Sequence, residues 1–173
     1  MTSSSRTSRG LSRTAGPEAA PGRKMPRWPG LVGTAASAAG LAVATYLTYE
    51  HFTSSSTLAC SDNGVVNCLK VTTSSYSSVA GVPVAVLGLV FFAVMLVLQL
   101  PVMWRRPEPA VRVTRLAWAV VGLCTVLYLL YAELFAIDAI CLWCTAVHAL
   151  ALVVFGTTVY ATATYPPPER API

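Results

Sequence analysis

Charged residues are scarce in this chain of 173 residues: they make up 11% of it, against about a quarter in ordinary soluble domains. Only 7 residues are Asp or Glu and 2 are His, and the 12 Lys and Arg residues lie in clumps. The scarcity of charge excludes a soluble globular domain and a coiled coil, and the clumping excludes a basic nucleic-acid-binding face. Four long stretches contain no charged residue: 28–49, 71–104, 116–132 and 139–168.

Hydrophobic residues make up 55% of the chain, and they fill these uncharged stretches. A helix needs about 20 mostly apolar residues to cross a bilayer, so each stretch can hold one span, the third only if residues 134–137 are added. We therefore predict an all-α integral membrane protein, a bundle of four helices. The first span is dense in Gly, Ala and Ser, which favours close packing against its neighbours. The expected spans are 31–50, 82–103, 113–135 and 140–163.

The two ends of the chain differ from the predicted membrane domain, residues 30–164. Residues 1–29 are rich in Ser, Arg, Gly and Pro, which predicts a disordered basic tail. An organelle transit peptide or a signal peptide is the alternative for this Arg-rich segment. Residues 165–173 form a short Pro-rich tail.

The basic residues predict the orientation in the membrane. Every Lys and Arg except Lys70 lies in a tail, between the second and third spans or, for Arg115, at the start of the third span. Positively charged loops stay in the cytoplasm. We therefore predict a multi-pass protein of the cell membrane with both termini cytoplasmic. An outward loop over about 51–80 and the 133–140 turn would lie on the extracytoplasmic side.

Four of the five cysteines are expected on the outward side, which is oxidising, so disulfides can persist there. Cys60 and Cys68 are separated by seven residues that include an Asp-Asn-Gly turn signal, and can close one disulfide. This pair is either a structural disulfide or a redox-active pair. The fifth cysteine, Cys124, lies midway along the third span and is expected to be a small buried hydrophobic residue.

Cys141 and Cys144 form a CLWC motif at the start of the fourth span. If Asp138 caps this helix, Cys141 is near the third helical position, where free amides and the helix dipole stabilise a thiolate. A redox pair is favoured over a zinc site because one pair enters the bilayer, and no metal is predicted. Solvation and capping account for Glu133 and Asp138.

His148 falls in one helical stripe with the two cysteines of CLWC, at about 100° per residue. An ionisable residue inside a span is a candidate functional residue. His148 either binds a ligand or a proton, or is bonded to a neighbouring helix. Trp143, inside the motif, either shapes a pocket or anchors the helix at the membrane interface.

Two dithiol pairs, one facing the surface and one facing the membrane, suggest an electron relay. A soluble thiol donor can reach Cys60 and Cys68 but no site below the membrane surface. A lipid-soluble acceptor can reach Cys144 but not the loop. Thiol–disulfide exchange would connect the two pairs.

Three segments together resemble the vitamin K epoxide reductase family, specifically bacterial homologues without a fused thioredoxin domain. They are the Cys60-x7-Cys68 pair, the segment SSYSSVAGVPVAVLG at 74–88, and CLWC after a short turn. The resemblance covers roughly residues 30–160. It implies a four-helix bundle around a quinone, with the outward loop covering the quinone pocket.

The resemblance also implies roles for the residues that match the family's motif. Cys144 would be the thiol nearest a menaquinone or ubiquinone that accepts electrons, and Cys141 its exchange partner. The loop pair would carry electrons from a separate thioredoxin-fold (DsbA-like) protein. Ser74 matches a serine near the active site, and His148 stands where relatives often carry a quinone-binding Tyr. With Trp143, these are the candidate quinone-binding residues.

The implied activity is a quinone-dependent thiol–disulfide oxidoreductase that drives disulfide formation in exported proteins. Two alternatives remain. One is a reductase acting on vitamin K or its epoxide, and the other is a non-enzymatic four-span scaffold with structural disulfides.

Overall fold

The computed structural model describes residues 27–53, 60, 64–106 and 108–164. The predicted tails, apart from residues 27–29, lie outside these ranges, and so does part of the predicted loop over 51–80.

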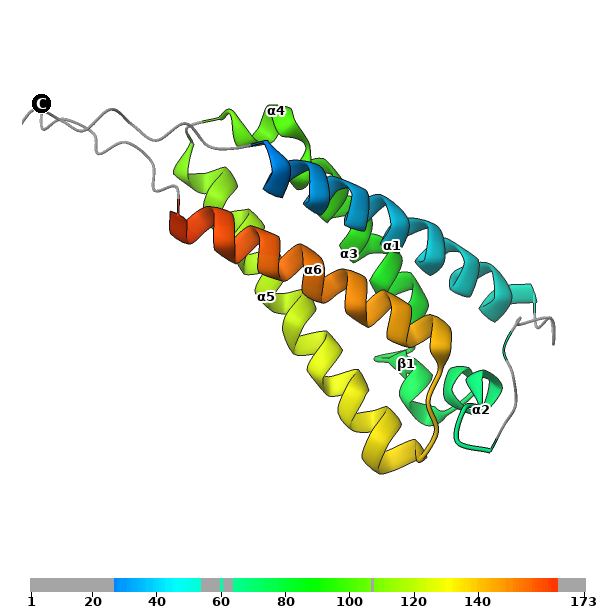
Figure 1. Cartoon of the computed structure of the whole chain (residues 1–173). Coiled ribbons are helices and arrows are strands. Elements are labelled where there is room, and N and C mark those ends of the chain that lie inside the picture. Colours follow the sequence, from blue (N-terminus) through cyan, green and yellow to red (C-terminus); the bar gives the residue numbers. More distant parts are fainter. Residues whose placement is uncertain (1–26, 54–59, 61–63, 107, 165–173) are drawn as a thin grey trace, which may run out of the picture.

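Four helices run along one another as a bundle (Figure 1): α1 (Trp28–Thr53), α3 (Val84–Gln99), α5 (Pro109–Tyr131) and α6 (Leu142–Thr164). Helix α1 packs along α3 and α6, and α5 packs along α6 and α3. The start of α1, the short helix α4 (Pro101–Trp104), the start of α5 and the end of α6 gather at one end of the bundle.

Three of the described helices are long and apolar enough to cross a membrane: α1, α6, and α5 with its continuation to Ile137. Helix α3 has 16 residues, about 24 Å at 1.5 Å per residue, whereas the hydrocarbon core of a bilayer is about 30 Å thick. The protein is thus a mostly helical membrane protein with three helices of spanning length, and the fourth span stays a prediction.

Pro101 explains why α3 is shorter than predicted. The sequence indicated a span over 82–103, but the helix ends at Gln99 and Leu100 adopts an extended conformation with φ −55° and ψ 139°. The proline ring disfavours the helical region for the residue before it. The chain therefore bends at Leu100 before it resumes as α4 (Pro101–Trp104), so the predicted span is divided between two helices.

Small residues on one face of α1 allow close helix contacts, as predicted from its composition. The buried residues of this face recur every three or four positions, which is the spacing of one helical side. A Cβ atom at Gly40 would overlap the ring of Phe92 on α3, which is completely buried. The small residues of the face are Gly30, Gly33, Ala36, Ser37, Gly40 and Ala44.

Short elements form a cap at the other end of the bundle. They are α2 (Cys68–Thr72), the 3-10 helix η1 (Ser75–Ser77) and a hairpin of β1 (Ser78–Val79) and β2 (Val82–Pro83), in which Val79 pairs with Val82. Helix α5 continues into a π-helical turn, η2 (Ala132–Ile137), which contacts α2. The four outward cysteines meet in a small apolar cluster between this turn, α2 and the start of α6.

Candidate active site

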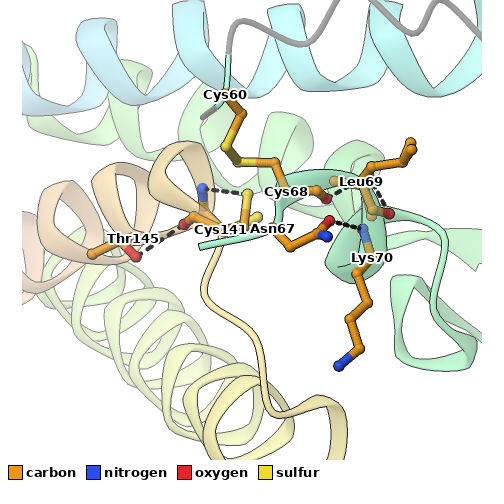
Figure 2. Close-up of a disulfide and its surroundings, with 9 residues drawn as sticks. Cys60, Asn67, Cys68, Leu69, Lys70, Cys141 and Thr145 are labelled. Atoms are coloured by element: carbon orange, nitrogen blue, oxygen red, sulfur yellow. Dashed lines mark hydrogen bonds between the residues drawn. A yellow bond between two sulfur atoms is a disulfide. The ribbon is translucent and has the colours of Figure 1, made fainter. Parts of the chain in front are cut away.

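The loop cysteines form a disulfide, Cys60–Cys68, with their Cα atoms 6.1 Å apart (Figure 2). Cys68 is the first residue of α2 and is buried, with 2% of its surface exposed. Cys60 is only half-buried. The two sulfur atoms of one disulfide therefore differ in access from outside.

Backbone hydrogen bonds attach the loop to the segment before α6. The amide of Asn67 donates to the carbonyl of Ile140 at 3.1 Å, and the amide of Ile140 donates to the carbonyl of Val65 at 2.9 Å. Asn67 precedes Cys68 and Ile140 precedes Cys141, so this short parallel bridge places the two cysteines side by side. Both belong to the same buried cluster.

Cys141 is the N-cap residue of α6. Its carbonyl accepts the amide of Thr145 at 2.8 Å, the first bond of the helix, and its Sγ accepts the amide of Cys144 at 3.3 Å. The prediction that Asp138 caps the helix was wrong: Asp138 ends the π-helical turn instead, in the left-handed region at φ 51°. Cys141 therefore stands just before the helix rather than at its third position.

The thiolate stabilisation expected at Cys141 is present, although it arises from this different geometry. A hydrogen bond from the Cys144 side chain lowers the pKa of the Cys141 thiol, and the amides of Cys144 and Trp143 act in the same direction. Burial and the carboxylate of Glu133 oppose them without reversing the result. Helix N-termini act on cysteines in this way because their amides point at the sulfur atom.

We expect the Cys141 thiolate to persist at lower pH than an ordinary cysteine thiolate, whose pKa is about 8.5. The sign follows from the lowered pKa, since the charged form is then retained further towards acid pH. The measurement is the ultraviolet thiolate absorbance of the fully reduced protein against pH. Subtracting the curve of Cys141→Ser from that of the wild type isolates Cys141, and subtracting the curve of Cys124→Ser isolates Cys124 as the matched control. A Cys141 transition no lower than that of free cysteine would contradict the expectation.

Glu133 is a site residue that sequence reasoning missed. It was expected to be solvated, but only 4% of its surface is exposed. Its carboxyl group lies close to the backbone of Cys141 and to the side chain of Cys144. The π-helical turn keeps Glu133 on the inner side of the bundle, where it faces the CxxC motif. The one sequence signal was an acidic residue set among apolar ones in YAELFAI.

An apolar cavity of about 660 Å³ lies beside the CxxC motif, among α1, α3, α5 and α6 and under α2 and η1. A cavity of this size is in the range that binds small molecules and cofactors. Its polar lining is sparse and includes Ser74, Glu133, Cys144 and His148.

The residues predicted to bind a quinone differ in their relation to this cavity. Ser74 and His148 line it, and Ser74 also donates a hydrogen bond to the carbonyl of Val71 at 2.8 Å. His148 is buried, and its Nδ1 atom has no hydrogen-bond partner among the described residues. Trp143 is not among the described lining residues; its ring packs at 5.1 Å from that of Tyr46.

The cysteines also divide by their place relative to the cavity. Cys144 lines it, whereas Cys141 lies behind it, next to the loop disulfide. Cys124, expected to be buried, is instead exposed on the outside of the bundle and far along α5 from the CxxC motif. The predicted stripe of Cys141, Cys144 and His148 thus reaches the cavity only through its last two members.

Comparison with known families agrees with this geometry. The sequence profile of the vitamin K epoxide reductase family matches residues 31–159, and the chain therefore belongs to this family. The comparison with curated proteins gave no significant match. The protein is accordingly a membrane oxidoreductase of a family whose chemistry involves quinones and thiols. The resemblance inferred from the cysteine pairs is confirmed.

Proposed function

We propose that the protein passes electrons from a reduced thioredoxin-fold protein to a membrane quinone and thereby drives disulfide formation in exported proteins. The observation that carries this proposal is the continuous arrangement of the cysteines. The Cys60–Cys68 disulfide packs against Cys141, and the Sγ atom of Cys141 accepts a hydrogen bond from the amide of Cys144. Cys144 in turn lines the cavity. Such a chain of sulfur atoms connects the surface of the cap with the interior of the bundle.

The difference in burial within the loop disulfide suggests the order of the exchange steps. A thiolate of the partner would attack Cys60, which is half-buried, and release Cys68. The second thiol of the partner would then resolve the mixed disulfide, and the partner leaves oxidised. Cys68 would attack Cys141 in the Cys141–Cys144 disulfide, so that the loop disulfide re-forms and the CxxC pair becomes a dithiol.

The lining of the cavity fits a quinone. Most of it is apolar, which suits a flat hydrophobic ring, and Ser74 and His148 offer polar atoms near Cys144. The unpaired Nδ1 of His148 is a buried polar atom that a carbonyl oxygen would satisfy. When bound, a quinone such as menaquinone or ubiquinone supplies the acceptor for two electrons and two protons.

The expected orientation suits this role. Helix α2, which begins at Cys68, lies at the opposite end of the bundle from α4 and the start of α5, the segments around which Arg105, Arg112 and Arg115 occur in the sequence. If the basic end faces the cytoplasm, the disulfide faces the compartment in which exported proteins acquire theirs, and both termini are cytoplasmic.

The test is quinone reduction by the purified protein in detergent, supplied with a reduced thioredoxin-fold protein. We expect Cys60→Ser and Cys68→Ser each to slow the loss of quinone absorbance by about 100-fold or more, because the partner's electrons then lack their first acceptor. Cys124→Ser, a cysteine outside the relay, is the matched control and should keep the wild-type rate.

Two other outcomes would replace the proposal. If no quinone is consumed and all four outward cysteines stay oxidised, the two pairs are structural disulfides. If quinone reduction is absent but vitamin K epoxide is converted to vitamin K, the protein is an epoxide reductase. Unchanged activity in Cys68→Ser would remove the loop from the electron path.

A further inference from the structure

Glu133 places a buried carboxyl group beside the CxxC motif, and the electron relay proposed above gives this group no role. Its carboxyl group lies close to both cysteines of the CxxC motif, near the backbone of Cys141 and the thiol of Cys144. It also lines the same cavity as Cys144 and is almost completely buried. Burying an ionised carboxylate is costly, and taking up a proton relieves that cost.

We propose that Glu133 takes the proton of the Cys144 thiol when the Cys141–Cys144 pair is oxidised, and passes it on within the cavity. This inference rests on the proposed function, since it assigns the proton path of that reaction. Glu133 is a catalytic residue in this scheme because it touches a reacting sulfur atom.

The step balances as follows. Oxidation of the dithiol forms one S–S bond between Cys141 and Cys144 and releases two electrons and two thiol protons. The quinone of the proposed function is the acceptor for both electrons and both protons. Glu133 receives the Cys144 proton as its sulfur becomes a thiolate and then releases it towards the acceptor. Its carboxylate is thereby restored for the next cycle.

Other ionisable groups also surround this site. Glu50 and His51 on α1, Tyr76 on η1 and His148 on α6 also line the cavity. Lys70 on α2 reaches the backbone carbonyl of Asp138 at 3.4 Å, at the outer side of the turn. Glu133 is assigned the role because its carboxyl group lies close to the Cys144 thiol and lines the same cavity.

The first test needs neither quinone nor partner. In the Cys124→Ser, Cys141→Ser background under non-reducing conditions, Cys144 is the one free thiol, because the loop pair stays in its disulfide. Its alkylation by a small uncharged maleimide is followed against pH. With Glu133 present we expect a nearly flat rate above about pH 8, where the pair holds one proton, because that proton moves between the thiol and the carboxylate and the total charge is unchanged.

In Glu133→Gln the proton must leave to solvent, so the rate should rise about tenfold per pH unit in the same range. Asp138→Asn is the matched control: it removes an exposed acid in the same turn, and Asn tolerates the left-handed conformation. It should keep the flat profile. A tenfold rise per pH unit above about pH 8 with Glu133 in place would overturn the proposal, and this result does not depend on whether Glu133→Gln folds.

The second test is the rate of quinone reduction. We expect Glu133→Gln to lower it by about 100-fold, a usual contribution of one acid–base residue, and Asp138→Asn to leave it unchanged. An equal rate in Glu133→Gln would also overturn the proposal. The electron relay and the proton transfer can be contradicted separately. If the wild-type protein reduces no quinone but shows the flat alkylation profile, the relay is wrong and the proton transfer to Glu133 is still supported.

Discussion

Replacing Cys144 with serine is expected to abolish quinone reduction, with a loss of at least about 10³-fold. Cys144 is the one cysteine of the two pairs that lines the cavity, so the electron path has no alternative sulfur atom at that point. A serine hydroxyl has nearly the same size as a thiol but contains no sulfur, so it cannot form a disulfide with Cys141. The substitution should leave the Cys60–Cys68 disulfide and the helix bundle unaffected.

A Cys60→Ser variant offers a second measurement that reports on the order of exchange. When the Cys68 thiolate attacks the Cys141–Cys144 disulfide, it forms a Cys68–Cys141 bond and releases the Cys144 thiolate; without Cys60 to displace Cys141, this mixed disulfide should accumulate. Peptide mapping under non-reducing conditions identifies that bond. Cys124→Ser controls for the loss of any cysteine. Full activity in Cys144→Ser, or a comparable loss in Cys124→Ser, would contradict the assigned path.

The second large effect is expected at the contact between α1 and α3. A Cβ atom at Gly40 would overlap the ring of Phe92, which has no free space because it is completely buried. Overpacking of this kind costs about 1–3 kcal/mol, while alanine gains about 1 kcal/mol over glycine in a helix interior. We expect Gly40→Ala to lower the free energy of unfolding by about 1 kcal/mol in net terms, since the ring and its neighbours must shift.

Gly156→Ala is the matched control for this prediction. Gly156 lies in α6, and a Cβ atom there meets no heavy atom within 4 Å. This substitution gains helix propensity without a clash and should be neutral or slightly stabilising. The measurement is thermal unfolding of both variants in the same detergent. A Gly40→Ala protein as stable as Gly156→Ala would show that α1 and α3 are less closely packed than described.

Much of the fold could be predicted because the sequence encodes it in composition and spacing. Uncharged stretches indicate where the long helices are, and the cysteine pairs indicate where the chemistry is. The predicted helix ends were wrong where a single residue sets the backbone conformation and the surrounding composition does not reveal it. Pro101 ends α3 within an apolar stretch, and Asp138 adopts a left-handed conformation that ends one helix instead of starting the next.

Glu133 and Trp143 show a second reason for incomplete prediction. Whether a side chain at the end of a helix faces inwards depends on the helical turn, and a π-helical turn changes that direction without a clear sequence signal. Glu133 therefore appeared to be a solvated residue although it is buried at the CxxC motif. Trp143 lies between the two motif cysteines in sequence, yet its ring packs against Tyr46.

The hydrogen bonds that cap α6 at Cys141 also bear on the redox balance between the two pairs. They favour the thiolate, which exists only when the CxxC pair is reduced. A disulfide whose reduced form is stabilised has a higher reduction potential and is the stronger oxidant. The helix start would therefore make the Cys141–Cys144 pair a stronger oxidant than the same disulfide without these hydrogen bonds, which is the direction that the proposed relay needs.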